Sequence, residues 1–487
     1  MTPAAASPDA PAPASEGWET VVGLEVHCEL RTATKLFCSC RNAFGEEPNT
    51  NICPVCLGLP GSLPVLNRQA VEYAMRIGEA LRSTVRPSIF HRKNYFYPDM
   101  PKDYQISQYD EPINVGGWLD LPDGKRVGIV RAHMEEDTGK TTHVGGGGRI
   151  HEASHSLVDY NRAGVPLVEI VSEPDMRSAD EARAYVDELR SILVATGASD
   201  GKMEEGSLRV DANVSVRRAG SRDYGTRCEI KNMNSLRSLG RATEYEAERQ
   251  RQLLEQGEEV VLETRHWNEA EGRTVSMRSK EEAFDYRYFP EPDLVPVAPE
   301  EAWQAGVRAA MPVLPAHRRE RLAAAAHTAA ADVALLVELE LDDLVLRAIE
   351  LGGEPKIALN RAANEVAADL AGARRLDAAA FAALVRMEGA GELTATQAKD
   401  VLAEMLGAGG DPAAIAKARG YQVLSSDALT AAVDEVIAAE AELCARFRAG
   451  DDKVLGALVG KVMDATQRRA DGKLVPALLR ERIRAQA

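Results

Sequence analysis

The sequence has few aromatic residues and no long apolar run. Aromatic residues make up 5% of the 487 positions. No stretch reaches the roughly 18 consecutive apolar residues of a transmembrane helix, so we expect no membrane span. The opening segment, MTPAAASPDAPAPASEG, contains no basic residue, which excludes the usual signal and transit peptide patterns. We expect residues 1–17 to be a disordered Pro/Ala tail and the protein to be cytoplasmic.

Positive charge is also scarce over most of the chain. The sequence contains 58 Lys and Arg against 75 Asp and Glu, giving a net charge of −17. Such a balance argues against broad, non-specific binding to nucleic acid. The deficit is uneven, because residues 445–487 contain ten basic and five acidic residues and carry +5, which leaves −22 on the remainder. The C-terminal tail is therefore set apart from the rest by its charge.

A glycine is missing where a phosphate-binding P-loop would need one. The segment Thr138-Gly139-Lys140-Thr141-Thr142 resembles the end of that motif. The first glycine of the motif would fall at position 134, which is Met134. The sequence therefore excludes a Walker-type nucleotide site at this position.

The chain divides by composition into three regions after the tail. Residues 18–295 alternate apolar and polar positions in many short strands with helices between them. A Pro-rich hinge at 290–299 precedes a helical region, 296–406, and the break Gly407–Pro412 introduces a smaller helical domain, 407–487. The predicted class is α+β, with an antiparallel sheet domain followed by two all-α domains.

Five of the 24 aromatic residues fall within one segment of twenty residues, His91–Asp110. Cations lie among them, including Arg92 and Lys93, and the segment has no helical periodicity. Planar rings beside fixed cations suit a surface that stacks a base and neutralises phosphate. The alternative is a Pro-containing loop whose tyrosines pack on a neighbouring element.

Several predicted strands, at 21–30, 127–136, 167–171 and 208–216, carry acidic or basic side chains on one face. Their alternation is typical of antiparallel strands with one face free of the core. The side chains concerned are Glu25, His27, Glu29, Glu169, Arg209 and Asp211. In the simplest alternative these polar faces are merely solvated.

Carboxylates that recur near one histidine indicate a bound cation, because like charges on one sheet face repel each other. Oxygen ligands with a single imidazole favour Mg2+ or Mn2+ over zinc. Such a metal could bridge the phosphates of a nucleotide, with Arg92, Lys93 or Arg209 neutralising the remaining charge. The residues alone therefore predict an enzyme that uses a metal and a nucleotide and acts on a carboxyl group.

Four of the seven cysteines form a second candidate metal site. Cys38 and Cys40 are followed after twelve residues by Cys53-Pro-Val-Cys56. Two close pairs of this kind suit a tetrahedral, closed and therefore structural zinc centre. The alternative is four unligated thiols. The other cysteines, Cys28, Cys228 and Cys444, are expected to be buried apolar residues.

Long segments of the chain resemble the B subunits of the aspartyl/glutamyl-tRNA(Asn/Gln) amidotransferases. They are GLEVHCEL from Gly23, RKNYFYPDMPKDYQISQYD from Arg92, HMEEDTGK from His133, DYNRAGVPLVEIVSEPD from Asp159, KMEEGSLRVDANVS from Lys202, EIKNMNS from Glu229 and GKVMDATQRRADGKLV from Gly460. The resemblance implies a glutamine-synthetase-like cradle, a helical linker domain and a C-terminal tRNA-binding domain. It also implies ATP-dependent amidation of misacylated Asp-tRNA(Asn) or Glu-tRNA(Gln).

Carried over by position, the family's magnesium cluster falls on Glu25, His27, Glu136 and Glu169. Asp211 is a further acidic member, and Lys93 and Tyr95 are expected at the nucleotide side. Glu135 competes with Glu136 for the inward position, because strict alternation separates the two and a bulge near Met134 would decide between them. In this family the four-cysteine site occurs in some members only, so zinc is expected to be structural.

The resemblance also implies partners. Ammonia would come from the amidase, which is the A subunit of such complexes, while a small C subunit would brace the pair. The substrate would be misacylated tRNA. Two other interpretations remain open: a non-catalytic scaffold that only holds tRNA, and a stand-alone ligase that acts on a free amino acid.

Overall fold

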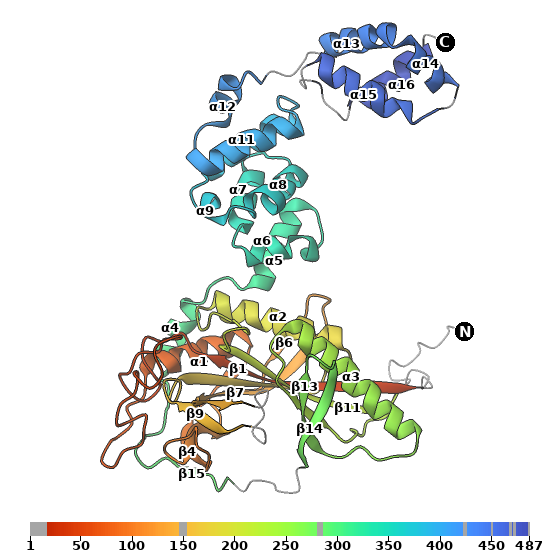
Figure 1. Ribbon diagram of the computed structural model, residues 1–487. Coiled ribbons are helices and arrows are strands. Elements are labelled where there is room, and N and C mark those ends of the chain that lie inside the picture. Colours follow the sequence, from red (N-terminus) through yellow and green to blue (C-terminus); the bar gives the residue numbers. More distant parts are fainter. Residues whose placement is uncertain are drawn as a thin grey trace, which may run out of the picture. The chain divides into compact units, whose positions relative to one another are not determined.

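The computed structural model describes residues 17–145, 153–279, 286–421, 426–449, 451–466, 470 and 474–485 (Figure 1). The chain forms two compact units, Met1–Pro315 and Ala316–Ala487. Apart from Gly17, the tail predicted at 1–17 lies outside the described residues. No helix in the described ranges combines the length and apolarity that crossing a membrane requires.

The first unit is built on a sheet of thirteen strands, whose main path runs β14-β13-β12-β11-β1-β10-β7-β4-β3-β15. The four strands predicted with one polar face are neighbours in it: β11 (Leu208–Arg218), β1 (Trp18–Glu29), β10 (Pro166–Ser172) and β7 (Arg126–Glu136). The other strands of the sheet are β2 (Thr84–Val85), β3 (Ile89–Asn94), β4 (Tyr104–Glu111), β5 (Asn114–Val115), β6 (Trp118–Asp120), β12 (Cys228–Lys231), β13 (Glu263–Asn268), β14 (Arg273–Ser279) and β15 (Phe289–Pro290). A separate hairpin pairs β8 (Lys140–Val144) with β9 (His155–Asp159).

The sheet is mixed and not purely antiparallel as predicted. β12 and β13 run parallel, because the helix α3 (Leu236–Glu255) connects them as a crossover. The other neighbours pair antiparallel, including all the contacts among β11, β1, β10 and β7. A sheet domain followed by helices confirms the predicted α+β class.

Three helices cover one face of the sheet (Figure 1): α1 (Arg68–Ala80), α2 (Ala179–Ala195) and α3. The even-numbered residues of β1 from Val22 to Cys28 are buried against this layer, in one core with Tyr185 and Leu189 of α2. Because side chains alternate across a strand, Glu25 and His27 lie on the opposite face. The helical layer thereby leaves the polar side chains together on the other side of the sheet.

The first unit extends past the boundary predicted at 295. Helix α4 (Glu301–Ala309) packs on α1, where the Arg68 guanidinium lies 4.2 Å from the Trp303 ring centroid. The Pro-rich segment before it does not separate domains, since Val297 exchanges backbone hydrogen bonds of 2.8 Å with Ser88. Residues 296–315 therefore belong to the sheet unit and not to the helical domain.

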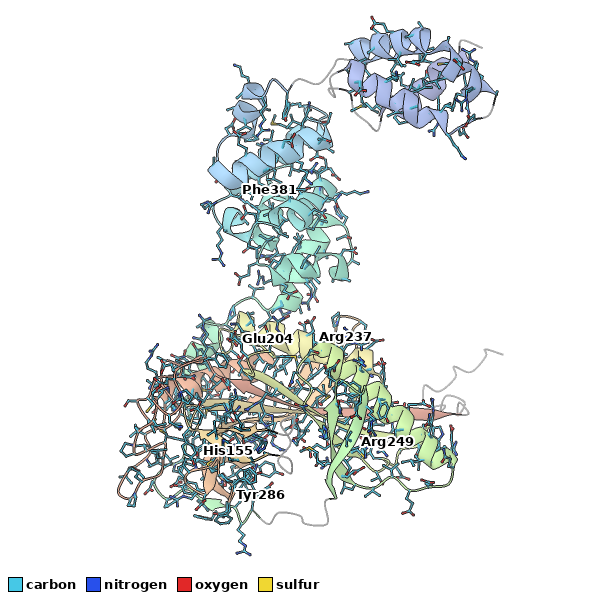
Figure 2. All side chains as sticks on the ribbon, in the orientation of Figure 1. His155, Glu204, Arg237, Arg249, Tyr286 and Phe381 are labelled. Atoms are coloured by element: carbon cyan, nitrogen blue, oxygen red, sulfur yellow. The ribbon has the colours of Figure 1, made fainter. Side chains whose placement is uncertain are left out.

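The second unit contains two groups of helices, each with its own core. The first comprises α5 (Pro315–Ala326), a 3-10 helix (Ala330–Val333), α6 (Ala334–Glu338), α7 (Asp342–Glu350), α8 (Pro355–Arg361), a π-helical turn (Ala362–Val366), α9 (Leu370–Ala373), α10 (Ala378–Gly389), α11 (Ala395–Ala408) and α12 (Pro412–Ala418). Phe381, labelled in Figure 2, is fully buried in this group. The second comprises α13 (Ser426–Ala439), α14 (Ala441–Arg448), α15 (Val454–Ala465) and α16 (Leu474–Ala485).

The boundary between these helical groups lies later than the predicted residue 407. Ile415 and Ala416 of α12 are buried in the core of the first group, and Tyr421 packs against it. The glycines at 409 and 410 end α11 and form a turn inside the group, with φ of 73° and 118°. The tail group therefore begins after Tyr421 and not at 407.

Candidate active site

The strand register brings the predicted acidic residues and His27 to one face of the sheet. His27 of β1 is directly opposite Glu169 of β10 on one side and Arg209 of β11 on the other. Glu25 is likewise opposite Asp211. Residues directly opposite in antiparallel strands share a face and have neighbouring Cβ atoms. Glu25, His27, Glu169 and Asp211 therefore form one polar surface, as the sequence predicts.

Three side chains on this face come close enough to share a cation. The Nε2 atom of His27 lies 3.7 Å from Glu135 Oε1 and 3.5 Å from Glu169 Oε2. One ligand atom from each of these residues lies within 4.8 Å of the others. Two carboxylates and an imidazole fit a hard divalent cation such as Mg2+ or Mn2+. We call His27, Glu135 and Glu169 the acidic trio.

Glu136 does not lie with the acidic trio, contrary to the prediction. Its side chain points to the other face, where Oε1 accepts a 2.9 Å hydrogen bond from the Ile106 amide and forms an ion pair with Lys102. Glu135 occupies the inward position instead.

The cause is a bulge in β7, at residues 129–131 and not at Met134. Val127 and Ile129 are buried in the helix-side core, but after the bulge Ala132 and Met134 take that side. The register shifts between Val171 and Ser172, which are opposite Arg131 and Ile129. One extra residue reverses the alternation, so that the odd-numbered positions up to Glu135 point to the polar face.

The acidic trio and its surroundings hold an excess of negative charge. Burial raises the pKa of Glu135, and the charge of Glu169 raises it further. The pKa of Glu25 is raised by the same two causes and by Glu229. Although burial disfavours the imidazolium, the hydrogen bond to Glu169 and the charge of Glu135 raise the pKa of His27 to about 9. Glu169 differs, because its burial is outweighed by the hydrogen bond with His27 and by the charges of His27 and Arg131, which lower its pKa. A bound cation would stabilise the ionised forms of Glu25 and Glu135.

His133, which was not among the predicted site residues, also belongs to this site. Its side chain is fully buried, and neither ring nitrogen has a hydrogen-bond partner within the described residues. Its Nε2 atom lies 3.7 Å from Glu169 Oε2. Burial, with the nearby charges of Arg131 and His27, lowers the pKa of His133 to about 4 and keeps the ring neutral. The two-residue spacing to Glu135 on one strand was the signal that could have found it.

Asp211 and Arg209 lie on the polar face but are already paired. Asp211 accepts a 2.6 Å hydrogen bond from Lys231, and Arg209 donates a 2.8 Å bond to Asp137. Lys231, which was also not among the predicted site residues, lies 3.0 Å from Glu229 as well. Asp211 is therefore a charge-balanced neighbour of Glu25 and no member of the acidic trio.

The aromatic segment is divided between the two faces of β3. Lys93 shares the polar face and lies 4.8 Å from the Tyr286 ring centroid. Arg92 points the other way and makes hydrogen bonds of 2.6 and 2.8 Å with Glu291, so it is not presented to the acidic trio. Tyr95 stacks on Tyr97 with ring centroids 5.8 Å apart, and burial raises its pKa to about 12.

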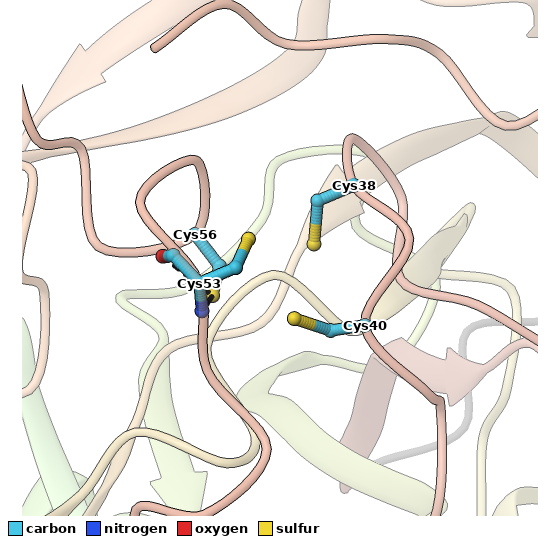
Figure 3. Close-up of side chains that lie close together, drawn as sticks. All are labelled: Cys38, Cys40, Cys53 and Cys56. Atoms are coloured by element: carbon cyan, nitrogen blue, oxygen red, sulfur yellow. Dashed lines mark hydrogen bonds between the residues drawn. The ribbon is translucent and has the colours of Figure 1, made fainter.

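The four predicted cysteines form a second cluster, away from the polar face. The Sγ atoms of Cys38, Cys40, Cys53 and Cys56 lie within 4.8 Å of one another, with the two pairs facing each other (Figure 3). The Cys53 amide donates a 3.1 Å hydrogen bond to Cys56 Sγ, and a hydrogen bond from Cys38 lowers the pKa of Cys56. The donor set fits a tetrahedral zinc ion. The remaining cysteines, Cys28, Cys228 and Cys444, are buried as predicted.

Comparison with known proteins shows the same family over nearly the whole chain. The sequence pattern of the "GatB/GatE catalytic domain" matches residues 20–305, and that of the "GatB domain" matches residues 343–483. A Frankia casuarinae protein is 52% identical over 483 residues, which cover 96% of both chains. A Thermobifida fusca protein is 50% identical over 489 residues, covering 96% of this chain and 94% of its own. Both are named as the B subunit of aspartyl/glutamyl-tRNA(Asn/Gln) amidotransferase, and the present chain belongs to this GatB family.

Proposed function

We propose that this chain phosphorylates the side-chain carboxylate of Asp-tRNA(Asn) or Glu-tRNA(Gln) with ATP, as part of a carbon–nitrogen ligase that converts it to the amide. The single observation that carries the proposal is the acidic trio on the polar face of the GatB/GatE catalytic domain. A cytoplasmic location goes with this substrate, which belongs to protein synthesis.

The chemistry explains why the face is built from charged residues. ATP and the substrate carboxylate are both anionic, so their approach requires compensation of charge. His27, Glu135 and Glu169 would hold Mg2+, which when bound supplies electrostatic stabilisation for the transferred phosphoryl group. Lys93 contributes a positive charge from β3, which is separated from β7 by β4, and this charge acts on Glu135.

The product of this step would be an acyl phosphate on the substrate side chain. Phosphate is a good leaving group, so neutral ammonia can attack the acyl carbon and displace it. The same carbon in a free carboxylate would resist this attack. Water would hydrolyse the same intermediate, so the site must exclude it. Glu135 and His133 are buried by the protein itself, which limits the access of water to this part of the face.

Ammonia must come from a partner in this scheme. Within the described residues the thiols are either clustered at Cys38–Cys56 or buried, which leaves none poised beside a histidine as a glutaminase nucleophile. We propose an amidase, the A subunit, as the source of ammonia and a small C subunit as the third chain. The basic tail would bind the tRNA backbone. Arg480 and Arg484 support this, because they are exposed on α16 one turn apart with no ion-pair partner among the residues described.

We further propose that the four cysteines bind one structural zinc ion. Four thiolates complete a tetrahedral shell and leave no open position for a substrate. The centre would stabilise the loop that it closes and would take no part in phosphoryl transfer.

A variant assay distinguishes this function from the alternative of a tRNA-holding scaffold. Glu25→Ala and His27→Ala should each lower amide formation by roughly 10²-fold, the scale for loss of an electrostatic element. Ammonium chloride replaces the partner as nitrogen source, and ATP turnover on misacylated tRNA is followed. Glu72→Ala, which removes a carboxylate from α1 on the helical side, serves as the matched control. Turnover at the wild-type rate by Glu25→Ala and His27→Ala would favour the scaffold, and turnover without tRNA would favour a stand-alone ligase.

A further inference from the structure

Lys35 is a fully buried lysine that lies beside the cysteine cluster. Its ammonium donates a 2.9 Å hydrogen bond to the Asn51 carbonyl and reaches the Tyr160 carbonyl at 3.5 Å. The third neighbour is Cys56 Sγ, at 3.9 Å. No carboxylate within the described ranges forms an ion pair with it. The positive charge of Lys35 therefore has carbonyl and sulfur partners only.

A buried ammonium with neutral partners alone is costly, because it loses its hydration without gaining an opposite charge. Four neutral thiols would leave Lys35 in that condition. Four thiolates around one divalent cation carry a net charge of −2, so a nearby ammonium would reduce the charge of the whole assembly to −1. The burial of Lys35 thus indicates an anionic centre at the cysteines, independently of their spacing.

We propose that Lys35 is the charge-compensating partner of a tetrathiolate zinc centre, to which it donates an N–H···S hydrogen bond at Cys56. This inference rests on the zinc site proposed above and adds a residue that the cysteine pattern does not reveal. Partners of this kind, behind the direct ligands, orient the ligands and set metal affinity.

Lys35 also joins the centre to the chain that enters β10. Residues 41–52, between the two cysteine pairs, are held to the segment 159–165 by Asn51, whose backbone amide donates a 2.8 Å hydrogen bond to Asn161 Oδ1. The Lys35 ammonium adds a second link, because it contacts the carbonyls of both Asn51 and Tyr160. Gly164 lies in this contact, because a Cβ placed there would be at van der Waals distance from Cys56 Cβ, 3.5 Å, and from Lys35 Cδ, 3.6 Å. Its φ of 85° favours glycine. Loss of the ammonium should therefore weaken zinc binding and also the attachment of residues 41–52 to the segment 159–165.

The test measures zinc release from the full-length, zinc-loaded protein. Lys35→Met removes the charge and keeps the length of the side chain, and Lys35→Gln keeps a donor without the charge. We expect transfer of zinc to a colorimetric chelator to be at least about tenfold faster from both variants, the usual scale for such partners. Lys125→Met is the matched control, because Lys125 pairs with Glu181 and contacts no thiol.

A second measurement separates charge compensation from ordinary packing. The melting temperature of each protein is compared with zinc bound and after chelation. Charge compensation predicts that Lys35→Met lowers the melting temperature more in the zinc-loaded protein than in the zinc-free protein. A lysine that only packs would shift both equally. Should Lys35→Met fail to fold, the same comparison is made with Lys35→Gln.

The outcomes distinguish the two proposals. Elemental analysis that finds no zinc in the wild-type protein would overturn the zinc site and, with it, the role of Lys35. Bound zinc with unchanged release from both Lys35 variants would overturn the role of Lys35 alone. Equal melting shifts with and without zinc would do the same.

Discussion

Glu135 and Glu136 are adjacent carboxylates on opposite faces of β7, so their Gln variants form a matched pair. The Glu136 and Lys102 side chains are 2% and 7% exposed, and breaking such a buried pair costs on the order of 3–5 kcal/mol of folding free energy. Glu135 has no lysine or arginine in ion-pair distance among the described residues, and it repels Glu169. We expect Glu135→Gln to change the free energy of unfolding by less than about 1 kcal/mol. Its rate of amide formation should fall by roughly 10²-fold.

Two assays on the same preparations test this contrast. Urea unfolding of the sheet unit, followed by tryptophan fluorescence, gives the stability of each variant. Amide formation from misacylated tRNA, ATP and ammonium chloride gives the activity. Glu135→Gln should lose activity and keep its stability, whereas Glu136→Gln should lose stability. A Glu135→Gln protein that works at the wild-type rate would refute the assignment of Glu135 to the acidic trio.

Three further predictions concern the cysteines, the tail and pH. Purification without chelator should yield one zinc per chain by elemental analysis, and Cys53→Ser should lower the melting temperature more than it alters the rate of phosphoryl transfer. The double variant Arg480→Ala/Arg484→Ala should bind tRNA more weakly, and the slope of log K against log salt concentration should fall by about one for each phosphate that is no longer neutralised. The control is Lys461→Ala, which should change this slope less because Lys461 already pairs with Glu440. Arg249 and Gln250 hold the pKa of Glu246 below its ordinary 4.5 despite burial, so the stability that Glu246 contributes is complete above that pH and is lost as pH falls. The acid side of the pH–stability curve should therefore be flatter in Glu246→Gln.

Part of the candidate site, and the strand face that its residues share, could be predicted from the amino-acid order alone. Alternation along β1 placed Glu25 and His27 away from the core, because a strand buried on one face repeats every two residues. The cysteine spacing predicted the second cluster in the same local way. The resemblance, carried by long motifs, predicted the family that the comparisons then showed.

How these local patterns meet depended on contacts between distant parts of the chain. The bulge at residues 129–131, which reverses the alternation of β7, is a feature of the pairing of this strand with β10. In this pairing Glu135, and not Glu136, points to the polar face. Alternation along β3 already places Arg92 and Lys93 on different faces. The partner of Arg92, Glu291, lies 199 positions away, and Asp211 is paired with Lys231. Local periodicity specifies a face within one strand, but the charges that neutralise a side chain come from elements the chain brings together only on folding.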